Sequence, residues 1–346
     1  PSLEGEMLVD LRGGTATYHH GDGPWARDTN IHVRTTTKTM AALCCLVLAD
    51  RGRLDLHEPI ASYWPEFAAH GKGGIAARHV LSHSAGLSGW DRRLTHSDLL
   101  DHEMLVRLHA DQAPWWTPGT RPGYHALSQG YLLGEIVRRV DGRSLGRFFA
   151  DEIAGPLGAD FHIGTDPVHD HRIAHVIPPP DPLAGGEGLD PAGIAHRTLA
   201  NPALHAGFSR TPEWRRAEIP AAGGHGNARA VSRIHTATAN GGEAFGTRVL
   251  SAAGVERIFE VQVEGDDLVL GLPQRLGMGF GLPHALAPFP NPRTCFWGGW
   301  GGSLAVIDID AHVSFAYVMN NMAGGTAGDL RSATLLRALY GSLGPG

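Results

Sequence analysis

The sequence predicts an α+β protein in which one antiparallel sheet is built from both ends of the chain, with helices between them. Residues 6–11 alternate apolar and polar side chains, which is typical of a strand, and residues 15–19 can return beside them as a neighbouring strand. Residues 304–309 and 313–319 alternate in the same way on either side of a short turn. Strands at both termini with helices between them favour a single sheet and a helical insertion.

Four segments carry the pattern of helices. Residues 35–50 are apolar nearly all round beyond Met40, so this helix is expected at the centre of the protein. Residues 126–140 and 228–239 are each followed closely by a glycine that can end a helix. Residues 329–343 carry leucines at helical spacing, which indicates one apolar stripe that covers a sheet.

These patterns divide one structural unit into two regions. Residues 1–60 and 225–346 are expected to form the sheet region and residues 61–224 a mainly helical region, with the active site at their junction. Within the helical region, residues 164–222 are rich in proline, glycine and histidine, which is typical of an irregular, lid-like loop. We expect this loop to govern substrate choice.

Composition and charge argue against several classes of partner. The net charge is −6, from 29 basic and 35 acidic residues, and no block of like charge occurs, so neither nucleic acid nor an anionic membrane is an expected partner. The longest apolar stretch, Met40–Ala49, is about half of what a membrane-spanning helix needs, which favours a buried core helix. No targeting segment is visible, so we expect a cytoplasmic protein that acts on a small molecule. The sequence does not indicate an oligomeric state.

Cysteines and histidines point to packing rather than to a metal. Cys44 and Cys45 are adjacent in an apolar run and Cys295 stands alone, which is neither a disulfide framework nor a metal spacing. The 21 histidines include a pair within residues 169–171 but form no compact ligand set. We therefore expect no metal site and no cofactor.

A hydroxyl and an amine are close together at the start of the central helix. Thr35 and Lys38 are three residues apart and fall on one face, whereas Thr36 and Thr37 lack that alignment. A helix N-terminus favours an alkoxide, and burial favours a neutral lysine that can accept a proton. The spacing thus predicts Thr35 as a nucleophile and Lys38 as its base. Taken alone, it favours the alternative of a helix cap at Thr35 beside a solvated Lys38.

Two further segments strengthen the catalytic interpretation. Tyr124 follows a proline and glycine loop just before a helix, where it is placed to exchange protons with the nucleophile and the leaving group, although an isolated tyrosine is more often a packed aromatic. Residues 297–303 are rich in glycine, so their N–H groups can form an oxyanion hole with that of Thr35, or else mark a tight bend. The predicted oxyanion and substrate-binding residues are Trp297, Gly298, Gly299, Trp300 and His125.

The order of these features resembles that of class C β-lactamases and family VIII carboxylesterases. These proteins carry hydroxyl-x-x-Lys near the N-terminus, a tyrosine roughly ninety residues later and a glycine-rich strand near the C-terminus. The resemblance covers nearly the whole chain and implies a β-lactamase/transpeptidase-like fold, shared with penicillin-binding proteins, and an acyl-enzyme on Thr35 with Lys38 and Tyr124 as acid and base. Further segments that look like those of bacterial family VIII esterases are residues 54–60, 63–67, 79–87, 114–120, 223–229 and 277–281.

The chain departs from the family pattern at three places. Thr35 stands where the family has serine, and its added methyl group restricts the hydroxyl rotamer. The lactamase patterns Tyr-x-Asn and Lys-Thr-Gly are here Tyr124-His125-Ala126 and Trp297-Gly298-Gly299, the latter as in the esterase branch. The family usually has a helix and part of a strand before the point where this chain begins, so the resemblance implies that an N-terminal helix is missing.

Other readings of the sequence remain open. An α/β-hydrolase needs Gly-x-Ser-x-Gly after a strand, but the nearest match, residues 126–130, lacks the first glycine and falls in a helical pattern. Within the favoured fold, an acyltransferase would use a small-molecule acceptor in place of water. A catalytically altered binding protein would explain Thr35 as lost or redirected chemistry or as an engineered change. The sequence favours a hydrolase that cleaves a small ester, amide or lactam.

Overall fold

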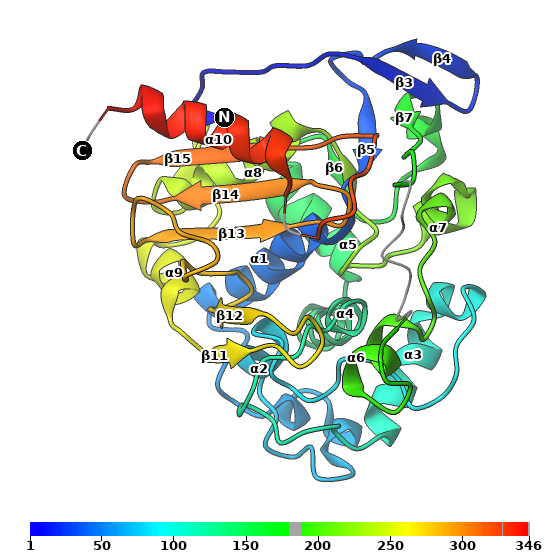
Figure 1. The fold of residues 1–346 in the computed structure, drawn as a ribbon. Coiled ribbons are helices and arrows are strands. Elements are labelled where there is room, and N and C mark those ends of the chain that lie inside the picture. Colours follow the sequence, from blue (N-terminus) through cyan, green and yellow to red (C-terminus); the bar gives the residue numbers. More distant parts are fainter. Residues whose placement is uncertain (180–187, 327, 345–346) are drawn as a thin grey trace.

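The main sheet joins both ends of the chain. The computed structural model describes residues 1–179, 188–326 and 328–344. Within them the sheet has five strands in the order β13-β14-β15-β1-β2 (Figure 1). Ser2 lies opposite Ser314 in an antiparallel pair, which confirms the predicted sheet from both termini. The strands are β1 (Ser2–Leu3), β2 (Glu6–Met7), β13 (Thr294–Gly298), β14 (Leu304–Asp308) and β15 (Val313–Tyr317).

The predicted strand pairing is right at the C-terminal end and wrong at the N-terminal end. β14 and β15 pair antiparallel around residues 309–312, as expected. Residues 6–11 do not pair with residues 15–19, because each segment has a nearer partner. β2 turns back onto β1 at Gly5, and β3 (Thr15–Tyr18) turns at Gly21 onto β4 (Gly21–Pro24). Both glycines have positive φ, 85° and 120°, which allows these tight turns.

A second, smaller sheet leads into the central helix. Its strand order is β6-β8-β5-β7, and β5 pairs with β8 antiparallel and with β7 parallel. β5 runs directly into the turn that precedes α1. This sheet therefore places the start of α1. Its strands are β5 (Asn30–His32), β6 (Phe161–His162), β7 (Ile173–Ala174) and β8 (His225–Gly226), and two separate hairpins are β9 (Glu243–Ala244) with β10 (Thr247–Arg248) and β11 (Val263–Asp266) with β12 (Pro273–Leu276).

The central helix is buried as predicted. α1 spans Thr37–Asp50 after a 3₁₀ turn at Arg34–Thr36, and every residue of α1 before Asp50 is buried. It contacts α4 (Ser128–Asp141), α5 (Leu145–Phe149) and α9 (Ala252–Glu256). The hydrophobic run that suggested a core helix is therefore at the centre of the core. In the described part of the chain, no helix has the length and apolarity that crossing a membrane requires.

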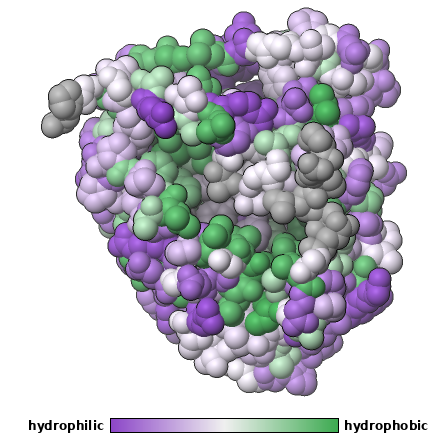
Figure 2. Space-filling model, viewed as in Figure 1, coloured by the Kyte–Doolittle hydropathy of each residue, from purple (hydrophilic) through white to green (hydrophobic). Residues whose placement is uncertain are grey.

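Helices cover the two faces of the main sheet unequally. α8 (Ala228–Ala239) packs against β14 and β15, and its bounds are those predicted. α10 (Leu330–Ser342) lies over the other face, where Leu336 and Leu339 pack on a small cluster centred on Phe315. Leu330 and Leu335 of α10 are 86% and 42% exposed, so only part of the predicted stripe covers the sheet. Hydrophobic side chains gather at the upper edge of Figure 2, where α10 and the segment after β2 lie in Figure 1.

The three cysteines are buried and unpaired. Cys44 and Cys45 lie within α1, and Cys295 lies in β13. They fill space in the core, as the sequence indicated.

The predicted irregular loop at residues 164–222 is partly helical. Residues 180–187 lie outside the described residues. After them come α6 (Ile194–Leu199) and α7 (Pro212–Arg216). Between these helices the Asn201 side chain accepts from the Leu94 N–H at 2.7 Å and donates to the Trp90 carbonyl at 2.8 Å. This part of the segment is thus anchored to the helical region. The remaining helices, α2 (Ala77–Leu81) and α3 (His102–Asp111), both precede this segment in the chain.

Helix α4 approaches a neighbouring backbone so closely that it requires glycine. A Cβ atom on Gly130 would lie 2.2 Å from the backbone nitrogen of Ala221 and 2.8 Å from the carbonyl carbon of Pro220. Such contacts cannot be relieved by moving a flexible side chain, because both atoms belong to the main chain. Gly130 therefore fixes the distance between α4 and residues 220–221.

We predict that Gly130→Ala lowers the free energy of unfolding, by about 1–3 kcal/mol, because the added methyl group forces these backbones apart. Gly341→Ala in α10 is the matched control, since a Cβ atom there meets nothing within 4 Å. That control should be neutral or stabilising by up to about 1 kcal/mol, the usual gain of alanine over glycine in a helix. Thermal and urea unfolding of both variants measure the difference, and equal stability of the two would contradict this account of α4.

Candidate active site

Thr35 lies in the 3₁₀ turn Arg34–Thr36 and is partly exposed, whereas its neighbours in the chain are buried. The turn holds Arg34 in the left-handed region, with φ of 58°, which is uncommon for a residue with a side chain. Thr37 supports this conformation, because its hydroxyl donates to the Arg34 carbonyl at 2.5 Å and accepts from the Gly224 N–H at 2.9 Å. The fold thus presents one hydroxyl at the start of an otherwise buried helix.

Lys38 is fully buried, and its hydrogen-bond partners are backbone carbonyls. Its side chain is 0% exposed, and its Nζ donates to the carbonyl oxygens of Ala126 at 2.8 Å and Ala221 at 3.2 Å. Among the described residues, no carboxylate lies within ion-pairing distance of it. Burial therefore lowers the pKa of Lys38 well below its ordinary value.

This geometry contradicts the alternative of a capping Thr35 beside a solvated lysine. The residue at the N-cap of α1 is Thr36, and no side chain caps that helix end. Lys38 is also removed from solvent rather than exposed on the first turn. The hydroxyl of Thr35 instead donates to the carbonyl of Gly298 at 3.0 Å, across the site.

Tyr124 lies next to both groups. It sits on the loop just before α4 and is partly exposed. The centre of its ring is 5.2 Å from the Nζ of Lys38. Burial raises the pKa of Tyr124, and the neighbouring hydroxyl of Thr35 opposes that rise to a smaller extent. The phenol is therefore protonated at neutral pH.

Asp267, which the sequence analysis missed, holds Tyr124 in place. This carboxylate is 3% exposed, and its Oδ1 accepts from the backbone N–H of Tyr124 at 3.0 Å. It also accepts from the N–H groups of Val269 and Leu270, each at 2.8 Å. Burial raises the pKa of Asp267 and these three N–H groups lower it. Nothing in the sequence separates Asp267 from a loop aspartate, because its partner is 143 residues away.

The glycine-rich loop after β13 directly contacts the turn that carries Thr35. A Cβ atom on Gly299 would lie 2.2 Å from the Oγ of Ser303 and 2.7 Å from the carbonyl oxygen of Val33. Glycine is thus required for the close approach of the two segments. In the remaining space, the Ser303 hydroxyl donates to the Val33 carbonyl at 2.8 Å and lies 2.9 Å from the Thr36 hydroxyl.

The same loop decides which N–H groups can face a substrate. The N–H groups of Gly299, Gly301 and Gly302 donate to carbonyls of Ser303, Gly325 and Gly299. The N–H of Trp300 has no acceptor among the described residues. Of the amides in the predicted oxyanion segment, that of Gly299 is therefore already used, and that of Trp300 is available.

His125 lies behind the site rather than in it. Its ring is fully buried, its Nδ1 donates to the Gly123 carbonyl at 2.6 Å, and its Nε2 accepts from the Leu87 N–H at 3.2 Å. Burial lowers the pKa of His125 to about 3, so the ring is neutral. Both ring nitrogens are engaged by the backbone, which leaves His125 a structural role. Trp297, by contrast, is partly exposed next to Tyr124, with ring centres 6.3 Å apart.

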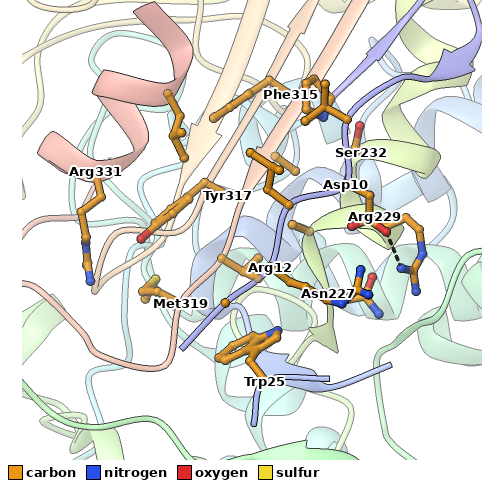
Figure 3. A pocket seen from close by; sticks show the side chains of 18 of the residues that line it. Asp10, Arg12, Trp25, Asn227, Arg229, Ser232, Phe315, Tyr317, Met319 and Arg331 are labelled. Atoms are coloured by element: carbon orange, nitrogen blue, oxygen red, sulfur yellow. Dashed lines mark hydrogen bonds and ion pairs between the residues drawn. The ribbon is translucent and has the colours of Figure 1, made fainter. Parts of the chain in front are cut away.

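A cavity of about 590 Å³ lies elsewhere, between α10, β15 and residues 7–13 (Figure 3). Trp25, Phe315 and Tyr317 are among its aromatic lining residues, and Asp10 pairs with Arg229 at 2.8 Å on one side. Its lining contains neither lysine nor histidine, so it offers no lysine or histidine base beside a hydroxyl. None of the predicted catalytic residues lines it. Among the described residues, no cluster of side chains suited to a metal ion was found.

Comparison with known proteins agrees with the fold. The family described as Beta-lactamase matches residues 3–339. Esterase/beta-lactamase LipL of Mycobacterium tuberculosis is 35% identical over 92% of this chain and 76% of its own length.

Two solved structures are similar over almost the whole chain. A family VIII carboxylesterase has a TM-score of 0.91 and 39% identity, covering 98% of this chain and 90% of that one. A penicillin-binding protein homologue from Caulobacter crescentus has a TM-score of 0.88 and 36% identity, covering 99% and 91%. The resemblance and the fold class inferred from the sequence are confirmed, and the chain belongs to the beta-lactamase family.

Proposed function

We propose that the chain is a hydrolase that cleaves small neutral esters through an acyl-enzyme on Thr35, with Lys38 as base and Tyr124 as acid. The observation that carries this proposal is the burial of Lys38, without a counter-charge from any described residue, beside a partly exposed hydroxyl. A surface lysine would be protonated at neutral pH and could not accept a proton. Burial lowers the pKa of this lysine well below its ordinary value, which favours the neutral state that a base requires.

The directions of the two pKa shifts divide the roles. Lys38, with a lowered pKa, takes the proton of the Thr35 hydroxyl as its Oγ attacks the ester carbonyl carbon. Tyr124, with a raised pKa, keeps its proton until the tetrahedral intermediate collapses and then gives it to the departing alkoxide. The ammonium of Lys38 returns a proton to the phenolate. An alcohol leaves, and the acyl group remains on Thr35.

Charge that develops on the carbonyl oxygen needs donors that are in place before the reaction. The N–H of Thr35 belongs to the first turn of a helix, where N–H groups lack an intrahelical acceptor. The N–H of Trp300 has no acceptor among the described residues. We assign these two groups as the oxyanion hole. Gly298 and Gly299 shape the strand edge, and His125 is left out of the substrate contacts.

Hydrolysis repeats these steps with water. The same base takes a proton from a water molecule, whose oxygen attacks the acyl carbon, and Tyr124 returns a proton to the Oγ of Thr35 as the acid leaves. An alcohol in place of water would give acyl transfer. Product analysis with added alcohol separates these two outcomes at the same acyl-enzyme.

We predict that an activated ester such as p-nitrophenyl acetate acylates Thr35 and that Lys38→Met, which keeps the volume of the side chain, abolishes the adduct. Peptide mapping by mass spectrometry locates the acyl group, and circular dichroism checks the fold. Thr35→Ser is the companion variant, expected to retain or increase turnover because it removes the methyl group beside the attack path. An adduct on Ser128 or Ser303, both buried, would disprove the assigned nucleophile.

Tyr124→Phe should lower kcat on the order of 10²-fold, because it removes a positioned acid, and should change KM less. In the unsubstituted protein, kcat/KM is expected to rise with pH as Lys38 loses a proton, and to level off well below the ordinary lysine pKa of about 10.4. This rise should remain in Tyr124→Phe, because the proton that is lost belongs to Lys38. Unchanged turnover would reduce Tyr124 to a packing residue.

Trp297 occupies the position where the lactamases resembled by this chain carry lysine. A cation there would pair with a substrate carboxylate, a contact worth roughly 1.5–3 kcal/mol, or about ten- to a hundred-fold in selectivity. Tryptophan instead offers an apolar wall. We expect a higher kcat/KM for p-nitrophenyl acetate or butyrate than for penicillins or cephalosporins. Measured on one preparation, a preference for the lactams would show that another cation supplies this contact.

A further inference from the structure

His83 lies in a turn after α2, within the segment 79–87 whose role the mechanism above does not use. It is 1% exposed, and its backbone has a φ of 56°, in the left-handed region. Residues with side chains adopt this conformation rarely, and strain of this kind persists only where the surrounding structure holds it. Three sets of contacts show what holds His83.

The first two sets join His83 to both neighbours of Tyr124. Its backbone carbonyl accepts from the N–H of Gly123 at 2.9 Å. Its ring Nδ1 accepts from the N–H of His125 at 3.0 Å. His83 therefore holds the backbone on both sides of Tyr124 by hydrogen bonds. Together with Asp267, which binds the N–H of Tyr124 itself, three consecutive amides of this loop are fixed.

The third set is made by the imidazole ring. Its centre is 5.3 Å from that of Tyr124, with the rings tilted, and 5.1 Å from that of Trp297, in a stacked arrangement with an interplanar angle of 25°. Tyr124 and Trp297 are farther from each other, at 6.3 Å. The ring of His83 thus packs against the proposed acid and against the wall of the substrate site at the same time.

We propose that His83 is a positioning residue that sets the Tyr124 hydroxyl and the Trp297 indole relative to Thr35. This inference rests on the proposed function. His83 is too buried to touch a substrate, so it acts through its two neighbours rather than in the reaction. Its Nδ1 must keep a lone pair to accept from His125, which requires a neutral ring. Burial, His125 and Lys38 lower the pKa of His83 well below its ordinary value and keep it in that form.

His83 supplies a hydrogen-bond acceptor, a flat ring and a side chain that fits the left-handed backbone. Two variants separate the acceptor from the ring. His83→Phe keeps a flat ring but removes the acceptor for the His125 N–H. His83→Asn keeps a short acceptor and tolerates the left-handed backbone, but removes the ring. If the acceptor positions Tyr124, His83→Phe should lower kcat by roughly ten- to a hundred-fold with a smaller change in KM. If the ring positions Trp297, His83→Asn should mainly raise KM for p-nitrophenyl butyrate.

A double-variant comparison tests whether His83 acts through Tyr124. Once Tyr124→Phe has removed the hydroxyl, its position no longer matters, so adding His83→Phe should cause little further loss of kcat. If His83→Phe caused only a structural defect, it would lower kcat independently of Tyr124→Phe, and the two losses would multiply. His109→Phe is the matched control. His109 is a buried histidine on α3 whose ring is tilted against that of Trp90, with ring centres 4.7 Å apart, and neither of its ring nitrogens has a hydrogen-bond partner among the described residues. It should leave kcat unchanged.

The outcomes are distinguishable. Independent, multiplying losses from His83→Phe and Tyr124→Phe would overturn the positioning role and leave the proposed function intact. If Tyr124→Phe left turnover unchanged, both the positioning role of His83 and the proposed function would be overturned. If both His83 variants had a normal kcat and KM while Tyr124→Phe was impaired, the positioning role of His83 would likewise be disproved. Melting temperatures measured on the same samples establish that each variant is folded under the assay conditions.

Discussion

The proposed site depends on one unusual interaction, the contact of a buried lysine amine with two carbonyl oxygens and, in the described part of the chain, with no carboxylate. A charged ammonium in this position would lose its hydration without gaining a counter-ion from the described residues, and this cost lowers the pKa of Lys38 well below its ordinary value. The carbonyls of Ala126 and Ala221 accept from the Nζ of Lys38 and so hold the side chain in place. Placement of these two carbonyls therefore orients the amine that we propose as the base, while burial lowers its pKa.

Short contacts between main-chain segments provide that placement. The carbonyl of Ala126 lies just before α4, and that of Ala221 belongs to the backbone against which Gly130 of α4 packs. On the opposite side, Gly299 lets the loop after β13 approach the turn that carries Thr35. The absence of a side chain at Gly130 and Gly299 thus fixes the proposed base and oxyanion donors with respect to Thr35.

Periodicity predicted the parts of this structure that are long enough to show a period. The central helix, α8 and the pairing of β14 with β15 follow directly from it. The burial of Lys38 does not, because the spacing alone favoured a solvated lysine. The predicted pairing of the short N-terminal strands was wrong, because strands of two to four residues carry almost no pattern and glycine turns decide their partners.

Long-range contacts could not be predicted in the same way. Asp267 reaches Tyr124 from a distant loop, and the sequence of that loop does not indicate the contact. The motif around His83 was visible as a resemblance, but its packing between two aromatic rings appears only in three dimensions. Which amide of the glycine-rich loop faces a substrate depends on the turn that uses the others internally.

The buried cysteines have a consequence for chemical selectivity. Cys44 and Cys45 follow Lys38 along the same helix, and Cys295 lies two residues before Trp297 in β13. Burial raises the pKa of Cys45 to about 12 and raises that of the other two thiols as well. All three therefore stay protonated and out of contact with solvent, although a thiolate is intrinsically the better nucleophile. An electrophile that enters the proposed site would therefore meet the Thr35 hydroxyl without competition from these three thiols.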